Sequence, residues 1–376
     1  MRILIVSRSA PDLHNGSGLH MEDFVHALEL QGCEIHYLAL CRTAGGPPRS
    51  RIHRVRFQEG PVQKDWDASA QEWEIRTVDR ICREIVPGVV IADYSWMGPI
   101  FDASYFREQD SVRRLIFIHD LRIRIMPSYV KMGFVRAEHN SWTDAREAAY
   151  LARGQVLLTL NEQDQRKAQE LSPAARVLRM AMSVPSVPTD EGAAVSGRCL
   201  YVASGLNENL YAAVWLLKFA WPRVVAAHPS ASLVICGGVG DMVKSLGAAE
   251  GDWLAELDRL NVWLEGRVET LAPYYASAQI ALVPHWMDGG IKIKHIEALS
   301  HGLAVVCTPA GADGLPEAVG RSAFSAETPE EFGDHIVRLL ANLDQLEAAR
   351  DEARNLARSL TPESAYREVA DFLREI

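Results

Sequence analysis

The sequence alternates short apolar runs with amphipathic stretches of helical length, and this pattern constrains the fold more than any other feature. In the first half the apolar runs fall at 2–7, 34–40, 51–57, 89–92, 115–118 and 155–160, and helices are expected over 17–31 and 66–85. Short strands that alternate with helices are typical of a parallel sheet covered by helices. The first half therefore predicts an α/β domain.

The alternation stops at 183–197, where the sequence SVPSVPTDEGAAVSG has two prolines, small residues and no periodicity, as linkers do. It then restarts, with strand-like runs at 200–203, 233–236, 262–264, 280–283 and 304–307 and helical stretches at 209–221 and 292–301. We therefore predict an α/β protein with two Rossmann-like domains that face a cleft, and 376 residues suit two domains. The predicted parts are an N-terminal domain (1–182), the linker (183–197), a C-terminal domain (198–360) and a final helix (361–376) that docks back on one of the two domains.

Charge and composition exclude several classes of protein. The net charge is -10, with 24 basic against 23 acidic residues in 1–189 and 15 against 26 in 190–376. Neither half is basic, so a nucleic-acid partner is not expected. Six scattered cysteines without a CxxC pair indicate reduced thiols in a cytoplasmic chain, and the histidines do not cluster, so no metal site is predicted. No run of eighteen apolar residues occurs, so no membrane-spanning helix is expected.

The segment 284–302, PHWMDGGIKIKHIEALSHG, carries the strongest sign of ligand chemistry. A strand ends at Pro284, two glycines follow, and a helix begins near Ile291. Glycines let the backbone approach a ligand, and the first amides of a helix have no partner within it, so this turn can bind phosphate. Lys294 and Glu297 share one helix face, where they could bind a diphosphate and ribose hydroxyls. A tight turn with a solvated Lys/Glu pair explains the spacing equally well.

Other candidate residues follow predicted strands. Segment 304–315, AVVCTPAGADGL, runs from a strand into a glycine-rich loop, as ligand crevices of α/β proteins do, although an ordinary connecting loop is favoured from the residues alone. Segment 11–20, PDLHNGSGLH, opens a helix with Gly16, Ser17 and Gly18 but lacks the third glycine of a dinucleotide fingerprint, which disfavours a nicotinamide cofactor. His119 and Asp120 end the apolar run IFIHD, where a lone histidine is more often structural.

The string GGIKIKHIEALSHGLAVVCTPAGADGL resembles the C-terminal signature of GT-B fold glycosyltransferases of family 4, the glycosyl transferases group 1. LYVASGLNENLYAAVWLLKFAWPRV, ASLVICGGVGD and VWLEGRVETLAPYYASAQIALVP resemble upstream pieces of the same nucleotide-sugar domain, in the same order. The resemblance covers about residues 198–320 and is weaker over the N-terminal half.

This resemblance implies a nucleotide diphosphate sugar as donor substrate and no cofactor. The residues that it places around the donor are Gly16, Ser17, Gly18, Asn207, Val268, Gly289, Gly290, Ile291, Lys292, Lys294 and Glu297. Among them, Lys294, Lys292 and the amides of 289–291 would stabilise the leaving diphosphate, and Glu297 would bind the ribose. The resemblance also places His119 at the junction of donor and acceptor, with Asp120 orienting the ring, and implies retention at the anomeric carbon without a metal.

The chain departs from the family at one position. Many members have two glutamates separated by seven residues; Glu297 matches the second, but the first falls at Gly289, and Asp288 is one residue out of register. In families that have it, the first glutamate lies near the donor sugar. The resemblance therefore does not predict the sugar or its contacts.

The acceptor side is predicted from the N-terminal half. Asp93 and Trp96 follow an apolar run, and Arg122 and Arg124 open the segment 122–136, in which basic and apolar residues alternate. This segment could contact a glycan, lipid-linked or small-molecule acceptor, or an anionic membrane surface at the cytoplasmic face; a loop with buried apolar positions is the alternative. Asp65 and Asp67 resemble a metal-binding D-x-D, but the start of a helix is the favoured interpretation.

The predicted reaction is hexosyl transfer to a hydroxyl group in glycan, polysaccharide or glycoconjugate biosynthesis. A nucleotide-sugar 2-epimerase shares the architecture and stays open, because it differs only in acid and base groups around the sugar. A non-catalytic nucleotide-sugar-binding partner of another transferase also stays open, because the first glutamate is missing.

Overall fold

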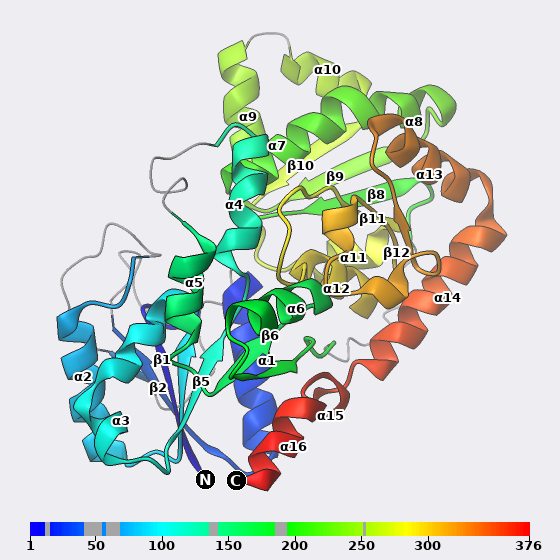
Figure 1. Cartoon of the computed structure of the whole chain (residues 1–376). Helices are drawn as coiled ribbons and strands as arrows, with labels where there is room; N and C mark the ends of the chain where they lie inside the picture. Colours follow the sequence, from blue (N-terminus) through cyan, green and yellow to red (C-terminus); the bar gives the residue numbers. More distant parts are fainter. Residues whose placement is uncertain (12–15, 41–54, 58–67, 135–141, 185–193, 251–252) are drawn as a thin grey trace. The chain divides into compact units, whose positions relative to one another are not determined.

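The computed structural model describes residues 1–376 except 12–15, 41–54, 58–67, 135–141, 185–193 and 251–252 (Figure 1). Its contacts group into two compact units. The first unit comprises Met1–Ser183, Gly289–Ile291 and Pro362–Ile376, and the second comprises Val184–Asp288 and Lys292–Thr361. The glycine pair of the 284–302 segment is therefore grouped with the first unit, although its helix belongs to the second.

A seven-stranded parallel sheet forms the first unit, in the order β3-β2-β1-β4-β5-β6-β7. Its strands are β1 (Arg2–Ser7), β2 (Glu34–Ala39), β3 (Val55–Phe57), β4 (Val89–Asp93), β5 (Arg113–Phe117), β6 (Val156–Thr159) and β7 (Arg176–Arg179). Its helices are α1 (Gly16–Leu30), α2 (Glu72–Ile85), η1 (Ser95–Asp102), α3 (Ser104–Glu108), α4 (Arg122–Lys131), α5 (Asp144–Leu151) and α6 (Glu162–Leu171). The strand order reverses direction between β1 and β4, and ligands of α/β sheets bind where the carboxyl ends of such strands meet.

The second unit repeats this plan with a six-stranded parallel sheet in the order β10-β9-β8-β11-β12-β13. The strands are β8 (Arg198–Val202), β9 (Ser232–Cys236), β10 (Val262–Gly266), β11 (Ile280–Val283), β12 (Ala304–Cys307) and β13 (Ala323–Ser325). The helical segments are α7 (Asn207–Trp215), η3 (Leu216–Ala220), α8 (Trp221–Ala227), α9 (Gly238–Glu250), α10 (Trp253–Arg259), α11 (Ala272–Ser277), α12 (Ile293–Ser300), η4 (Pro309–Ala312), η5 (Pro316–Ala318), α13 (Pro329–Ala341) and α14 (Leu343–Ser359). The order reverses between β8 and β11, so the loops that lead into α7 and α12 start side by side. Two parallel sheets with interleaved helices confirm the predicted fold class.

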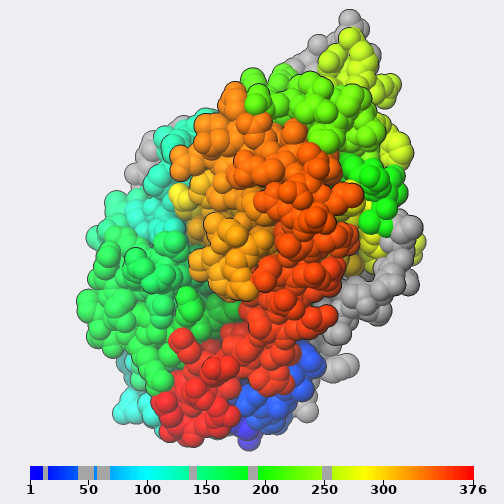
Figure 2. All heavy atoms as spheres, turned by 90° about the vertical axis from the view of Figure 1, so that its right-hand side faces the viewer, coloured from blue at the N-terminus to red at the C-terminus, as the bar shows by residue number. Residues whose placement is uncertain are grey.

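The final helix docks on the first unit, which answers the question that its sequence left open. It consists of α15 (Pro362–Ala365) and α16 (Arg367–Glu375), and Tyr366, Val369 and Phe372 join the hydrophobic core of the first sheet. The Tyr366 hydroxyl donates a hydrogen bond of 2.6 Å to Asp23 on α1. The red C-terminal segment accordingly lies beside blue α1 (Figure 2).

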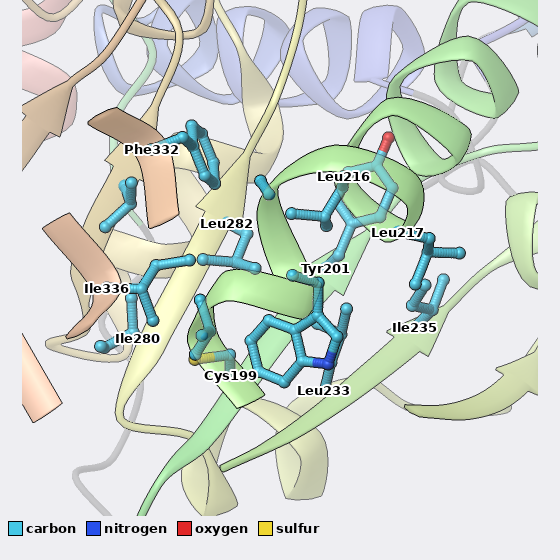
Figure 3. Packing of buried hydrophobic residues seen from close by; sticks show 14 of the residues in the cluster. Cys199, Tyr201, Leu216, Leu217, Leu233, Ile235, Ile280, Leu282, Phe332 and Ile336 are labelled. Atoms are coloured by element: carbon cyan, nitrogen blue, oxygen red, sulfur yellow. The ribbon is translucent and has the colours of Figure 1, made fainter. Parts of the chain in front are cut away.

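One helix departs from the expectation that none could cross a membrane. α7, η3 and α8 join into a continuous helix over 207–227, which is long and apolar enough by length and composition alone. Leu216 and Leu217 on this helix are buried and pack with Tyr201 and Ile235 in the second core (Figure 3). Such packing is typical of a core helix in a globular unit.

Two element boundaries differ from the prediction. The helix predicted over 66–85 begins at Glu72, because the Gln71 side chain and Glu74 form a capping box there. The strand predicted over 51–57 is described only as β3, because 51–54 lie outside the described residues, as do Asp65 and Asp67.

Candidate active site

In the first unit, three side chains meet at the carboxyl ends of neighbouring strands. Ser7 ends β1, Asp93 ends β4, and His119 follows β5. The Ser7 hydroxyl donates to Asp93 Oδ2 at 2.6 Å, and His119 Nε2 lies 2.8 Å from Asp93 Oδ1. All three residues are buried. Asp93 therefore fixes the plane of the His119 ring, and Ser7 fixes Asp93.

This arrangement corrects one predicted contact. Asp120 is expected from the sequence to orient the His119 ring, but the carboxylate that bonds the ring is Asp93. The predicted place of Asp93 on the acceptor side stays a prediction. The sequence could not show which carboxylate bonds the ring, because Asp120 is next to His119 in the chain whereas Asp93 is next to it in the sheet.

Aromatic rings hold His119 from several sides. Phe117 stacks on it with ring centroids 4.2 Å apart, Tyr94 lies at 4.5 Å, and His20 approaches edge-on at 6.0 Å. Burial and the neighbouring His119 lower the pKa of His20 to about 3, so His20 is neutral near pH 7. Ser17 of the predicted glycine-rich loop hydrogen-bonds the Tyr94 hydroxyl, which brings Ser17, Gly16 and Gly18 close to this cluster.

The predicted acceptor residues have unequal access to solvent. Trp96 is only 2% exposed, and its ring supports the Arg122 guanidinium, which lies 4.9 Å from the ring centroid. Arg122 itself is half-buried. Trp96 therefore positions Arg122 and has little surface to offer an acceptor.

Buried Glu147 supports the start of α4. Its carboxylate accepts hydrogen bonds from Trp142 Nε1 at 2.6 Å, from the Ile123 amide at 3.1 Å and from the Ser95 hydroxyl. Burial raises the pKa of Glu147, and these three donors oppose the shift. Glu147 thus joins α4 to the loop after β4.

Arg124 is part of a hydrogen-bond network around Asp164 on α6. Arg124 donates to Asp164 Oδ1 at 2.7 Å and to Asn161 Oδ1 at 3.2 Å. Asp164 is completely buried and also accepts from the Gly290 amide at 2.9 Å, while Asn161 donates to the Gly290 carbonyl at 2.9 Å. The Gly290 amide, which was expected to bind the diphosphate, is therefore occupied by Asp164 in this structure.

The backbone explains why positions 289 and 290 are glycines. Their φ angles are 89° and 65°, a region that favours glycine. A Cβ atom at Gly290 would lie 2.7 Å from the His119 carbonyl oxygen. A glutamate at 289, as many family members have, would be strained in this loop.

In the second unit, α12 brings basic side chains to the carboxyl ends of β8 and β11. Lys294 Nζ donates to Asn209 Oδ1 on α7 at 3.0 Å and lies 5.3 Å from the centroid of the Tyr201 ring. Lys292 is the N-cap of α12 and is 7% exposed. Burial, followed by the charge of Lys292, lowers the pKa of Lys294 to about 8.

His285 lies beside the two lysines. Its pKa is lowered well below the ordinary value by burial and then by Lys292 and Lys294, so the ring is neutral near pH 7. The His285 amide donates to Thr308 Oγ1 at 2.9 Å, which ties this loop to the end of β12. The buried Nδ1 atom of His285 has no hydrogen-bond partner in the described structure. Two lysines and an imidazole thus interact electrostatically in this part of the second unit, where Glu208 and Glu297 also act on Lys294.

Glu297 lies one turn further along α12. Its Oε2 accepts a hydrogen bond of 2.9 Å from the hydroxyl of Tyr275 on α11. Burial raises the pKa of Glu297, whereas Tyr275 and then Lys294 act in the opposite direction. The lysine and the carboxylate are therefore on one face, as their spacing predicted.

Three other predicted donor residues have different surroundings. Asn207 is exposed at the first position of α7, and the asparagine that contacts Lys294 is Asn209. Val268 is half-buried in the loop between β10 and α11, and Ile291 packs on the core of the first unit. The sequence prediction missed Asn209, His285, Tyr275 and Asp164; only Asn209 had a signal, because it shares the N-E-N triplet with Asn207.

Among the residues that the structure describes, no three His, Cys, Asp or Glu side chains gather as metal ligands. The D-x-D candidate at 65–67 lies outside those residues, as do positions 135 and 136 of the basic segment.

Comparison with known proteins finds a family similarity in the second unit. Residues 196–342 match the model of the family described as glycosyl transferases group 1. A curated relative, an uncharacterized 44.6 kDa protein in the cps region of Klebsiella pneumoniae, is 24% identical over 143 residues. The match covers 37% of this chain and only about a third (35%) of that relative.

Solved structures extend the similarity to the whole chain. Sucrose-phosphate synthase from Thermosynechococcus elongatus has a TM-score of 0.69 at 17% identity and covers 100% of this chain and 98% of that one. HepE from Anabaena, solved with UDP and glucose, has a TM-score of 0.69 at 13% identity over 100% of both chains. TarM has a TM-score of 0.72 at 9% identity over 98% of both. The chain has the GT-B fold, and its residues 196–342 are similar to the glycosyl transferases group 1 family.

Proposed function

We propose that this protein is a glycosyltransferase that moves a hexosyl unit from a nucleoside diphosphate sugar to an acceptor hydroxyl. The observation that carries the proposal is the α12 cluster, in which Lys292, Lys294 and His285 converge within the family-matched domain. Relatives support the donor class, since HepE was solved with UDP and with UDP-glucose. The base, the sugar and the acceptor are questions for experiment.

The catalytic part of the proposal is electrostatic. Negative charge develops on the diphosphate as the sugar leaves, and Lys294 and Lys292 stabilise that charge. A pKa of about 8 keeps most Lys294 side chains protonated at pH 7 while its burial strengthens the interaction. Glu297 binds the ribose hydroxyls, and His119, held by Asp93, contacts the transferred sugar.

We further propose retention at the anomeric carbon, no requirement for a divalent metal, and a role in polysaccharide or glycoconjugate biosynthesis. The cps-region relative supports the pathway class. A chelator should leave turnover unchanged; loss of turnover would direct attention to Asp65 and Asp67.

A cytoplasmic location, with peripheral contact at the inner membrane surface, belongs to the same proposal. The contact would involve α4, where Val130 is 50% exposed beside Lys131. Replacing Lys131 and Val130 with serine should reduce sedimentation with anionic vesicles, and unchanged sedimentation would remove the membrane contact.

The experiment for the function combines UDP-, GDP-, ADP- and dTDP-sugars with a panel of sugar, glycerol and lipid-linked acceptors. Mass spectrometry should detect one nucleoside diphosphate released for each glycoside formed. Conversion of a donor alone into its epimer would identify an epimerase instead. Donor binding without turnover on any acceptor would identify a non-catalytic partner.

A further inference from the structure

A buried tyrosine contacts the proposed ribose-binding carboxylate. Tyr275 lies on α11 and is 2% exposed, and its hydroxyl donates to Glu297 Oε2 at 2.9 Å. Its ring stacks on His301, with centroids 4.6 Å apart and an interplanar angle of 5°. Since His301 follows Glu297 by one helical turn, the tyrosine lies along the same face of α12.

Near neutral pH the Tyr275 hydroxyl is protonated, so it is the donor in its hydrogen bond to Glu297. Burial, and next the charge of Glu297, raise the pKa of Tyr275 well above its ordinary value, so the phenol keeps its proton. A buried phenol also needs a hydrogen-bond partner, and Glu297 is the one that the structure provides.

The other oxygen of Glu297 is in a different situation. Among the described residues, Tyr275 is the only side chain that hydrogen-bonds this carboxylate. Glu297 is half-buried, and Oε1 is not among the fully buried side-chain atoms that lack a hydrogen-bond partner in the described structure, so it keeps access to solvent on the face that also carries Lys294. A ligand with a diphosphate for Lys294 and a vicinal diol for Glu297 is a nucleoside diphosphate.

We propose that Tyr275 is a positioning residue that saturates Oε2 of Glu297, fixes the carboxylate, and directs Oε1 to the ribose hydroxyls of the nucleoside diphosphate. This inference rests on the proposed function. Its consequence is selectivity for the ribose diol, and diphosphate binding through Lys294 does not depend on it.

Several charged or titratable groups surround this pair. Lys294 lies one turn before Glu297, His301 one turn after it, and Cys236 of β9 interacts electrostatically with Tyr275. Among the groups that lower the pKa of Glu297, the hydrogen bond from Tyr275 has the largest effect, so it does most to keep Glu297 ionised against its burial. Without the hydroxyl, Glu297 should become protonated at a higher pH.

The test compares UDP with 2′,3′-dideoxy-UDP as calorimetric probes for the wild type and Tyr275→Phe, with the GDP and ADP pairs as alternatives. Tyr275→Phe should weaken UDP binding by about three- to tenfold and leave dideoxy-UDP binding unchanged. The pH at which UDP affinity is lost on acidification should rise, since the protonated carboxyl accepts less well. Tyr274→Phe is the matched control, because Tyr274 precedes it on the same helix and bonds the exposed Glu265 at 3.2 Å.

Equal UDP affinity and an unchanged pH profile in Tyr275→Phe would overturn the inference and leave the proposed function standing. A wild type that binds none of UDP, GDP, ADP and dTDP would overturn both. If Tyr275→Phe does not fold, Glu297→Gln supplies the second variant, because its amide oxygen still accepts from Tyr275. Glu297→Gln should lose the preference for UDP over dideoxy-UDP, and an intact preference would also overturn the inference.

Discussion

The buried polar clusters of the two units differ in charge from what the sequence halves suggest. The nearly neutral first half buries the carboxylates of Asp93, Glu147 and Asp164, whereas the acidic second half gathers Lys292 and Lys294 at its candidate site. Net charge is set by exposed residues, and a ligand responds to the few charges that burial removes from water. The net charge of one half of the sequence therefore does not predict the charge of the site that this half forms.

The two clusters also differ in how they satisfy their charges. Asp93 and Asp164 receive hydrogen bonds from side chains and backbone of the first unit itself. In the second unit two lysines lie close enough for one to lower the pKa of the other. The first cluster is therefore a preformed scaffold, and the second gains stability when an anion arrives.

The largest expected effect comes from the basic cluster. Lys294→Ala should lower turnover by about 10²–10³-fold, because the leaving diphosphate loses its nearest cation. The melting temperature should change little, since the lysine is held by one hydrogen bond to Asn209. Lys244→Ala, at an exposed lysine of the same unit, is the control. A fully active Lys294→Ala enzyme would remove the phosphate assignment.

In the first unit, Asp93→Asn should lower turnover by about 10- to 100-fold, because an amide in place of the carboxylate holds the His119 imidazole in the wrong tautomer. Steady-state kinetics should show the loss in kcat while donor affinity is kept. Asp120→Asn is the comparison variant. If Asp120→Asn had the larger effect, the original assignment from sequence would be right and the Asp93 contact would be structural only.

The glycine loop offers a smaller, structural test. Gly290→Ala should lower the free energy of unfolding by about 1–3 kcal/mol, through strain at φ 65° and the close His119 carbonyl. Gly320→Ala separates the two causes, because its φ is 80° but no atom lies within 4 Å of the added Cβ. Equal losses in urea titrations of both variants would show that the close approach contributes nothing.

The smallest expected effect is on pH dependence. With a pKa of about 8, Lys294 loses its charge as the pH rises from 7 to 9, so nucleoside diphosphate affinity should fall by about tenfold over that range. Affinity falls as the pH rises because the protonated, cationic form of Lys294 is the one that binds the diphosphate. Calorimetric titrations of UDP should show this fall in the wild type and not in Lys294→Ala.

Sequence reasoning succeeded where a site depends on local spacing. The strand-to-helix turn before α12 and the shared face of Lys294 and Glu297 follow from residues within one short segment. The predicted alternation also matched both parallel sheets. The sequence does not determine which unit receives the final helix. Its amphipathic pattern indicates that one face packs against another surface, but it does not identify that surface.

Sequence reasoning missed contacts made between distant segments. Asp93 meets His119 across 26 residues, Asp164 meets Gly290 across 126, and Asn209 meets Lys294 across 85. The Asp93 and Asn209 contacts depend on which strands are neighbours in a sheet, and no spacing in the chain records that order. The occupied Gly290 amide illustrates the consequence, since the turn reads as a phosphate site until Asp164 is placed beside it.

The most direct measurement is a titration of UDP, or of the nucleoside diphosphate that binds best, into Lys294→Ala and Asp93→Asn. The comparison assigns the anion to the basic cluster of the second unit and a positioning role to the carboxylate scaffold of the first. Lys294→Ala should weaken binding by about 100-fold, whereas Asp93→Asn should bind as tightly as the wild type. Equal affinity in Lys294→Ala, with a loss in Asp93→Asn, would contradict the account.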